Sequence, residues 1–151
     1  MKRRSLMLAL PALAATAHLP ARPQALPTLE VWKDPNCGCC KDWIAHLEQA
    51  RFRVRSHDSG NTAARQRLGL APRYASCHTA LIAGYAIEGH VPARDIQRLL
   101  AERPDALGLA VPGMPVGSPG MDGPVYGGRR DPYDVLLVLR NGGHRVYQSY
   151  A

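Results

Sequence analysis

Residues 29–50 read LEVWKDPNCGCCKDWIAHLEQA, and this segment indicates a strand, a cysteine-rich turn and a helix in succession. Residues 29–32 alternate between apolar and polar side chains, as half-buried strands do. Residues 34–36, Asp-Pro-Asn, break that alternation with types that favour turns. Beyond Cys39 the apolar side chains recur at helical spacing, at Trp43, Ile44, Leu47 and Ala50. Three cysteines are therefore expected at the N-terminal end of a helix that follows a strand.

The middle of the chain predicts further strands and one short helix. Residues 52–55 alternate and predict a second strand, and residues 62–68 predict a helix that Gly69 ends. The apolar run 79–83 predicts a buried strand, with a hairpin partner at 85–87. A strand, a helix and a second strand in succession form a parallel pair with a crossover helix.

The C-terminal half adds a helix, a loop and a hairpin. Pro92 opens a helix that residues 103–104, Arg-Pro, end. Residues 104–132 are rich in Gly and Pro and are expected to form a long loop, a kind of segment that is usually functional or mobile. Two apolar runs, 133–139 and 144–150, flank an Asn-Gly-Gly turn and predict a C-terminal β-hairpin.

These elements predict an α/β fold, a thioredoxin-like mixed sheet with flanking helices, the Gly/Pro-rich loop and the hairpin. The motif from Cys37 to Cys40 is a C-x-x-C with an extra cysteine inside it, and its place at the start of a helix after a strand is the thioredoxin arrangement. Gly38 is expected to let the backbone turn tightly there. Ligands favour this edge of an open sheet.

The chain has 151 residues, enough for one domain, which we place at residues 29–151. Its formal net charge of +7 suggests an anionic partner at first sight. The arginines are scattered, however, and only one Phe is present, so nucleic-acid binding is not expected.

The N-terminus has the pattern of an export signal. Residues 2–4 are Lys-Arg-Arg, residues 6–17 are mainly apolar, and residues 15–17, Ala-Thr-Ala, fit a cleavage site. We interpret residues 1–17 as a signal peptide, similar to the twin-arginine type, and residues 18–28 as a linker. A disordered or membrane-anchored tail is the alternative. No segment of the mature chain is expected to cross a membrane, and a periplasmic location is predicted.

The spacing of the cysteines points to redox or metal chemistry. Four cysteines in an oxidising compartment often form two structural disulfides, but Cys37, Cys39 and Cys40 are too crowded for ordinary cross-linking. A helix N-terminus favours thiolates, and a soft cation such as Cu(I) or zinc would relieve the repulsion among them. A disulfide between Cys37 and Cys40, with Cys39 as a small core residue, is the alternative.

Cys77 is expected to face the cysteine-rich turn as a fourth thiolate. It precedes the buried strand, and in a thioredoxin-like fold the loop before that strand lies against the C-x-x-C turn. A buried free thiol is the alternative for Cys77, and a hydrogen-bonding role is the alternative for the adjacent His78.

Four further side chains are candidate auxiliary metal ligands, namely His78, His90, Met114 and Met121. His90 lies at a helix entrance, where a polar turn residue would serve equally well. The two methionines flank residues 115–120 of the Gly/Pro-rich loop. Thioethers suit Cu(I), but they also pack against hydrophobic cores.

Four blocks of sequence resemble the CopG-type periplasmic copper-resistance proteins, long catalogued only as a domain of unknown function. The blocks are residues 37–43 (CGCCKDW), 76–79 (SCHT), 84–92 (GYAIEGHVP) and 111–121 (VPGMPVGSPGM). The resemblance runs from about residue 29 to the C-terminus.

This resemblance implies a thioredoxin-like fold and copper bound by Cys37, Cys39 and Cys40 with the later Cys77. It also implies a role in copper tolerance, with copper cycled between Cu(I) and Cu(II) and exchanged with other periplasmic copper carriers. Whether the protein is a copper oxidoreductase or only stores the metal stays open, and no residue is assigned a catalytic role.

Two other functions fit the same cysteines. A thiol–disulfide oxidoreductase would use Cys37 as the nucleophile and Cys40 as the resolving thiol, although the extra cysteines could trap wrong disulfides. A structural zinc site could use all four cysteines as tetrahedral ligands, and removal of the zinc would then unfold the domain.

Overall fold

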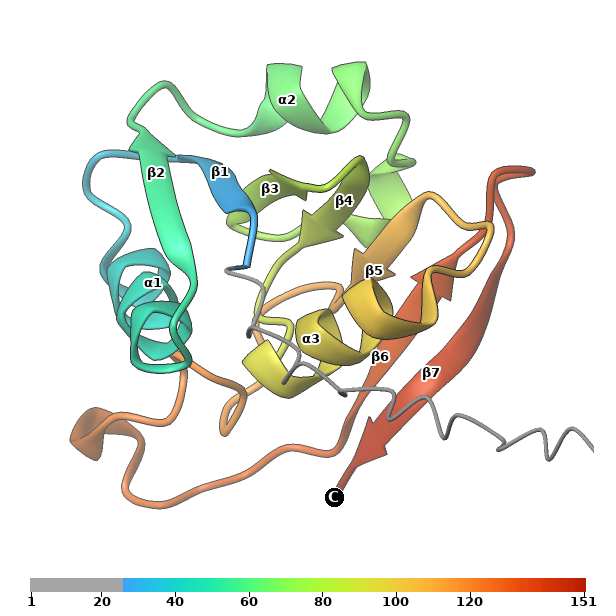
Figure 1. Ribbon diagram of the computed structural model, residues 1–151. Helices are drawn as coiled ribbons and strands as arrows, with labels where there is room; N and C mark the ends of the chain where they lie inside the picture. Colours follow the sequence, from blue (N-terminus) through green and yellow to red (C-terminus); the bar gives the residue numbers. More distant parts are fainter. Residues whose placement is uncertain (1–25) are drawn as a thin grey trace, which may run out of the picture.

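The computed structural model describes residues 26–151, which form seven strands and three α-helices (Figure 1). The strands are β1 (Thr28–Lys33), β2 (Arg53–His57), β3 (His78–Ile82), β4 (Tyr85–Glu88), β5 (Gly108–Ala110), β6 (Tyr133–Val138) and β7 (His144–Tyr150). The helices are α1 (Gly38–Gln49), α2 (Thr62–Arg67) and α3 (Ala93–Glu102), with 3-10 turns η1 (Pro72–Tyr74) and η2 (Pro124–Tyr126). The predicted signal peptide and most of the predicted linker lie outside the described residues.

All seven strands belong to one mixed sheet with the order β2-β1-β3-β4-β5-β6-β7. Strands β1 and β2 are parallel and joined through α1, as expected for a crossover unit. Strand β3 is antiparallel to both β1 and β4. The mixed α/β class is thus confirmed, whereas the thioredoxin-like relationship stays a prediction.

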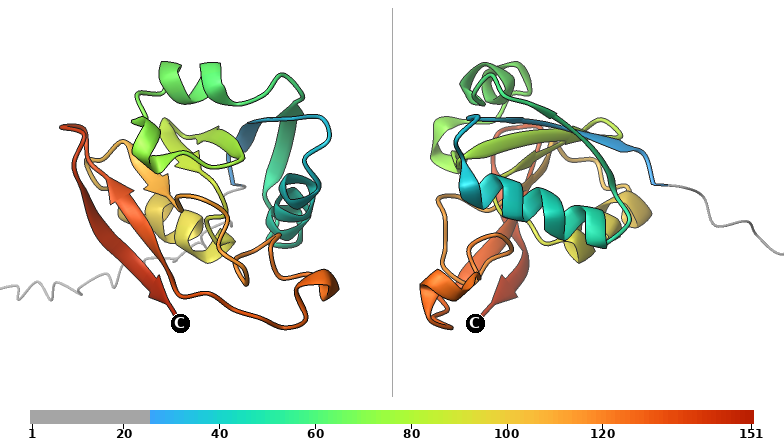
Figure 2. Two further views of the ribbon diagram at one scale, coloured as in Figure 1. Left: turned by 180° about the vertical axis from the view of Figure 1, so that it is seen from behind. Right: turned by 90° about the vertical axis from the view of Figure 1, so that its left-hand side faces the viewer.

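The helices lie on both faces of the sheet. Figure 2 shows α1 and α3 together on one side and α2 on the opposite side. Between the sheet and the first pair lies the main core, in which Trp43 and Leu47 of α1 and Ile96 and Leu99 of α3 are fully buried. Trp43 and Leu47 belong to the apolar spacing that the sequence predicts for α1, and the other two residues of that spacing, Ile44 and Ala50, are half-buried.

A short strand lies where only loop was expected. Strand β5 falls within residues 104–132 and pairs with β4 in parallel and with β6 antiparallel. Three residues, one of them Gly, are too few to show a strand period in the sequence. Because β5 bridges β4 and β6, it joins the predicted hairpin β6–β7 to the rest of the sheet.

Two details of the predicted turns differ from the structure. Gly38 is the first residue of α1 and has no positive φ, so the tight turn before the helix does not depend on it. Pro92 caps α3 from the position before its first residue rather than opening its first turn.

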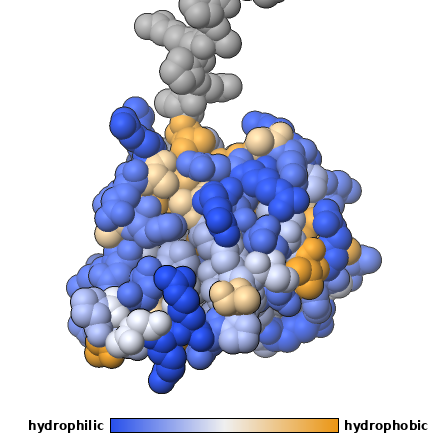
Figure 3. Space-filling view, turned by 90° about the horizontal axis from the view of Figure 1, so that it is seen from below, coloured by the Kyte–Doolittle hydropathy of each residue, from blue (hydrophilic) through white to orange (hydrophobic). Residues whose placement is uncertain are grey.

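The surface is mainly polar. In Figure 3 the face seen from below is largely hydrophilic, with small and separate apolar patches. Large hydrophobic side chains that are exposed among residues 26–151 are Met114, Val125 and Val146. No helix in this part of the chain is long and apolar enough to span a bilayer.

Candidate metal centre

The first turn of α1 places three cysteines at one end of the helix. Cys37 is the N-cap residue, and Cys39 and Cys40 follow within the first turn. The preceding turn is closed by the Cys37 amide, which donates to the Asp34 carbonyl oxygen at 3.1 Å. The unpaired amides and the dipole of a helix N-terminus favour negative charge, so this position suits thiolates.

The loop that carries Cys77 is fixed by a buried acidic side chain, Glu88 of β4. One Glu88 oxygen accepts hydrogen bonds from the Ser76 amide at 2.7 Å and from Arg65 Nε at 2.9 Å, and the other accepts from the Thr79 hydroxyl. Burial raises the pKa of the Glu88 carboxyl, outweighing the opposing effect of these partners. This network holds the residues on both sides of Cys77 and His78.

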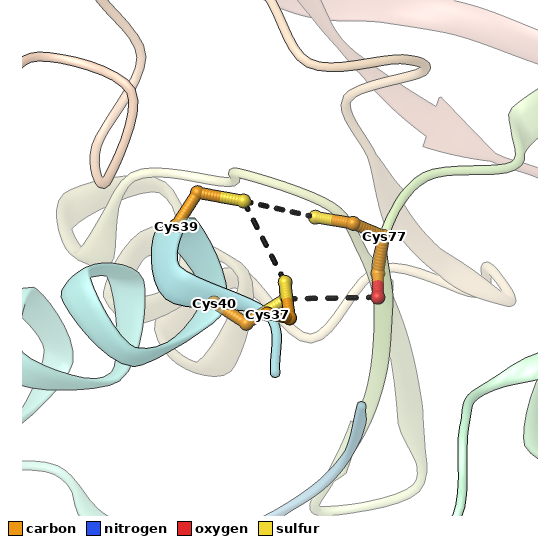
Figure 4. A group of neighbouring side chains, drawn as sticks. All are labelled: Cys37, Cys39, Cys40 and Cys77. Atoms are coloured by element: carbon orange, nitrogen blue, oxygen red, sulfur yellow. Dashed lines mark hydrogen bonds between the residues drawn. A yellow bond between two sulfur atoms is a disulfide. The ribbon is translucent and has the colours of Figure 1, made fainter. Parts of the chain in front are cut away.

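The four sulfur atoms converge on one point (Figure 4). Cys39 Sγ lies 3.6 Å from Cys37 Sγ and 3.7 Å from Cys77 Sγ. Cys40 Sγ lies 3.6 Å from the carbonyl oxygen of Cys77. All four sulfurs are within 4.8 Å of one another, close enough to share a metal ion.

Two of these sulfurs are covalently bonded. Cys37 and Cys40 form a disulfide, whereas Cys39 and Cys77 are free and half-buried. The disulfide matches one of the alternatives drawn from the sequence, but Cys39 faces Cys77 rather than the core. A set of four thiolate ligands therefore requires this bond to be reduced, and it stays a prediction.

Two buried imidazoles complete the surroundings of Cys77. Cys77 Sγ is 3.3 Å from His78 Nδ1 and 3.1 Å from His90 Nε2. The other ring nitrogens lie 2.9 Å from the Gly89 carbonyl oxygen and 2.8 Å from the Pro119 carbonyl oxygen, respectively. Because a carbonyl only accepts, those nitrogens carry the protons, and each ring directs a lone pair at Cys77.

The surroundings keep all three groups uncharged when no metal is bound. Burial, reinforced by His90, lowers the pKa of His78 to about 3. Burial also lowers the pKa of His90. Burial, with the neighbouring Cys39, raises the pKa of Cys77 to about 12. A cation bound here therefore replaces the thiol proton of Cys77 and meets two neutral nitrogen donors.

The Gly/Pro-rich loop packs directly on the cysteine turn. Gly120 has φ +85°, and a Cβ there would lie 2.5 Å from the Cys39 carbonyl oxygen and 2.8 Å from the Trp43 amide nitrogen. The Pro119 carbonyl in the same segment holds His90. This part of the loop is a fixed wall of the site.

The two methionines of the loop differ in their surroundings. Met121 is buried, and its sulfur accepts a hydrogen bond from the Tyr126 hydroxyl at 3.3 Å. Met114 is 52% exposed. Neither thioether is hydrogen-bonded to a cysteine, so their ligand roles stay predictions.

The structure brings the four cysteines and both predicted histidines together in two overlapping groups that share Cys77. Sequence reasoning missed the positioning residues Glu88 and Arg65. A signal was present for Glu88, because it is an acidic residue directly after the apolar residues 85–87 of a predicted strand. No local signal marks Arg65, whose role depends on the approach of α2 to β4.

The chain matches one family model and two solved structures. A family model described as "Protein of unknown function, DUF411" matches residues 74–121. No curated protein matches the chain. Two solved structures do, both of the copper resistance protein CopG. Form 1 is 48% identical with a TM-score of 0.76, covering 83% of this chain and 98% of that chain. Form 2 is 47% identical with a TM-score of 0.77, covering 83% and 99%.

The DUF411 match includes Cys77, His78 and His90. The identity extends over most of both chains and is far above the level at which only a fold is shared. The protein therefore belongs to the CopG family of copper resistance proteins.

Proposed function

We propose that this protein is an exported copper-binding protein for copper resistance. It holds Cu(I) in a cluster formed by Cys37, Cys39, Cys40 and Cys77. The observation that carries this proposal is the convergence of four sulfurs within 4.8 Å at a helix N-terminus. Thiolates are soft ligands that select Cu(I) and can bridge more than one ion.

Auxiliary ligands would complete the cluster. His78 and His90 direct lone pairs at Cys77 and are the nearest nitrogen donors. Met121 and Met114 lie on the loop that packs on the cysteine turn and would add thioether donors or shield the copper. A mixed set of sulfur and nitrogen donors suits both oxidation states, which supports cycling of copper between Cu(I) and Cu(II).

The copper would be received and passed on outside the cytoplasm. Residues 1–17 would direct export to the periplasm on the twin-arginine route, and residues 29–151 would form the mature copper-binding domain. Other copper carriers in that compartment would be the donors and acceptors of the ion.

Anaerobic Cu(I) titration of the fully reduced protein tests the binding, with a competing chelator and metal analysis. More than one tightly held Cu(I) per chain is expected. Cys77→Ser removes the sulfur common to both ligand groups and should weaken binding at least about tenfold, equivalent to roughly 1.4 kcal/mol. Ser56→Ala, at an exposed position of β2, is the control. Weak binding by the wild type would contradict the proposal.

One observation favours a second function, thiol–disulfide exchange. The Cys37–Cys40 disulfide has a half-buried first sulfur and a fully buried second one, so an external thiol would meet Cys37 first. Turnover of a disulfide substrate by the metal-free protein is the test. Turnover combined with weak Cu(I) binding would put this function first.

A further inference from the structure

The four sulfurs fall into two pairs with different chemistry. Cys37 and Cys40 are bonded to each other, and their Cα atoms lie 5.3 Å apart, within the range that a disulfide needs. Cys39 and Cys77 remain free in the same structure. The backbone therefore accommodates oxidation of the first pair while the second pair keeps its thiols.

The donors that survive this oxidation still form a connected set. Cys39 Sγ is 3.7 Å from Cys77 Sγ, and Cys77 Sγ is within 3.3 Å of one nitrogen of each imidazole. Two thiolates and the two nitrogens of His78 and His90 would be left to hold copper. Cys39 also lies 3.6 Å from Cys37, so it connects the oxidised pair to this set.

We propose that the reduced pair Cys37 and Cys40 is the electron source that converts Cu(II) to Cu(I) at this site. This inference rests on the proposed copper-binding function. Two thiols lose two protons and two electrons and form the Cys37–Cys40 bond. Each of two Cu(II) ions takes one electron and becomes Cu(I), so charge and atoms balance.

The positions of the sulfurs support separate roles for the two pairs, electron supply by Cys37 and Cys40 and copper binding around Cys77. Imidazole nitrogens are suitable ligands for Cu(II), and they are supplied around Cys77 by His78, at the start of β3, and by His90, between β4 and α3. The Cys37–Cys40 pair lies on the opposite side, at the start of α1. Electrons would pass between them through Cys39, which contacts a sulfur of each side.

Oxidation of the pair also changes how much copper the site can hold. It removes two of the four thiolates, so Cu(I) formed in the reaction has fewer ligands and is easier to transfer. An external dithiol would restore the pair by attack on the half-buried Cys37 sulfur, since Cys40 is fully buried. Copper reduction and copper release are thereby linked to one disulfide.

Addition of Cu(II) to the fully reduced protein without oxygen tests the proposal. Unreacted Cu(II) is sequestered with EDTA, and Cu(I) is counted with a Cu(I)-specific chelator. About two Cu(I) per chain are expected early in the reaction, because formation of one disulfide releases two electrons. Alkylation and tryptic mass spectrometry then locate the new bond.

The tryptic cleavage sites in the sequence separate Cys77 from the other three cysteines, so the position of the new disulfide can be assigned. Cleavage after Lys33 and Lys41 gives one peptide with Cys37, Cys39 and Cys40, while Cys77 lies in a separate peptide. The expected product is the short peptide with an internal bond and with alkylated Cys39. A link to the Cys77 peptide, or a bond that includes Cys39, would overturn the proposal.

Two serine variants separate the electron source from the copper ligands. Cys37→Ser removes the bond at the N-cap, where serine is favoured, so the helix should persist. We expect it to lose the early Cu(I) yield. Cys39→Ser keeps the electron source but removes the connecting sulfur, so it should reach the same final Cu(I) yield more slowly and release Cu(I) to the chelator more readily. Equal early yields from Cys37→Ser and wild type would refute the electron source.

Failure of this inference differs from failure of the copper-binding proposal. If the reduced protein binds supplied Cu(I) tightly but does not reduce Cu(II) through this pair, copper binding stands and the electron source is wrong. If it binds no Cu(I), the copper-binding proposal itself fails.

Discussion

Glu88 is a fully buried carboxylate, and the sequence does not mark it as a candidate metal ligand. Its two oxygens accept from Ser76, Thr79 and Arg65, and Arg65 also donates to the Ser76 carbonyl. We expect Glu88→Gln to lower the free energy of unfolding by about 3–5 kcal/mol, because it leaves Arg65 without its charge partner. Urea denaturation measures the loss. Cu(I) affinity should fall too, since the Cys77 loop loses its support.

Glu102→Gln is the matched control for this change. Glu102 also binds an arginine, Arg98, and accepts from the Tyr147 hydroxyl, but its side chain is 45% exposed. Solvent screens such a pair, so the control should destabilise the protein far less than Glu88→Gln does. Equal losses for the two variants would mean that Glu88 does not hold the loop.

His78 should make the copper-free protein less stable in acid. Its pKa is lowered from 6.5 to about 3, chiefly by burial. At pH values between these two, His78 is protonated in the unfolded chain and neutral in the folded protein. Stability attributable to His78 is complete above 6.5 and decreases as the pH falls through this window. The slope approaches about 1.4 kcal/mol per pH unit for one such group.

Urea denaturation of wild type and His78→Gln at several pH values isolates this effect. Glu88, whose pKa is raised, has the opposite slope above its unfolded value of 4.5, so only the difference between the two proteins is diagnostic. The difference should shrink as the pH is lowered. A difference that stays constant with pH would show that His78 is accessible to protons when folded.

At the scale of elements, the Gly/Pro-rich loop is tied to the start of α1 through Gly120. Ala at this position would combine a positive φ with a Cβ 2.5 Å from the Cys39 carbonyl oxygen. We expect Gly120→Ala to cost about 2 kcal/mol or more and to weaken Cu(I) binding, because the loop must move away from the cysteine turn. Thermal unfolding and the Cu(I) titration measure the two effects.

Gly113→Ala controls for the backbone strain alone. Gly113 has φ +71°, and nothing lies within 4 Å of an added Cβ. It should cost about 1 kcal/mol and leave copper affinity unchanged. If the two alanine variants behave alike, contact between the loop and α1 is not required for the site.

The elements that the sequence predicts well are those with a local cause. Helix α1 has its apolar spacing, and the β6–β7 hairpin has the Asn-Gly turn, so each pattern is contained in a few neighbouring residues. Strand β5 has no such pattern, because its three residues become a strand only through pairing with β4 and β6. Its position depends on contacts that are distant in the sequence.

The same distinction applies to the site. Crowding of three cysteines in the sequence predicts a sulfur cluster, and the structure places Cys77 beside it. The tautomers of His78 and His90 are set by the carbonyl oxygens of Gly89 and Pro119, which the fold brings to the rings. The sequence identifies these side chains as candidates, but only the tertiary structure determines which ring nitrogen faces the Cys77 sulfur.

For the molecule as a whole, the main core reaches the site at Trp43, whose ring centroid lies 4.1 Å from that of His78, but the cysteines and histidines of the site are not part of that core. The main core between the sheet and helices α1 and α3 consists of aliphatic and aromatic side chains, and a second cluster forms around Tyr74 and Leu70. Among the cysteines only Cys40 is fully buried. Burial of this apolar surface, rather than a bound metal, therefore supplies the main driving force for folding.

We accordingly expect the reduced, metal-free protein to stay folded. Reduction with a phosphine followed by chelation should leave the far-ultraviolet circular dichroism and a cooperative thermal transition in place. Cu(I) should raise both the melting temperature and the free energy of unfolding. At a free Cu(I) concentration one hundred times the dissociation constant, the free energy of unfolding should rise by about 2.7 kcal/mol. If the cysteines instead formed a structural zinc site, chelation would abolish the transition, and the copper function would lose its support.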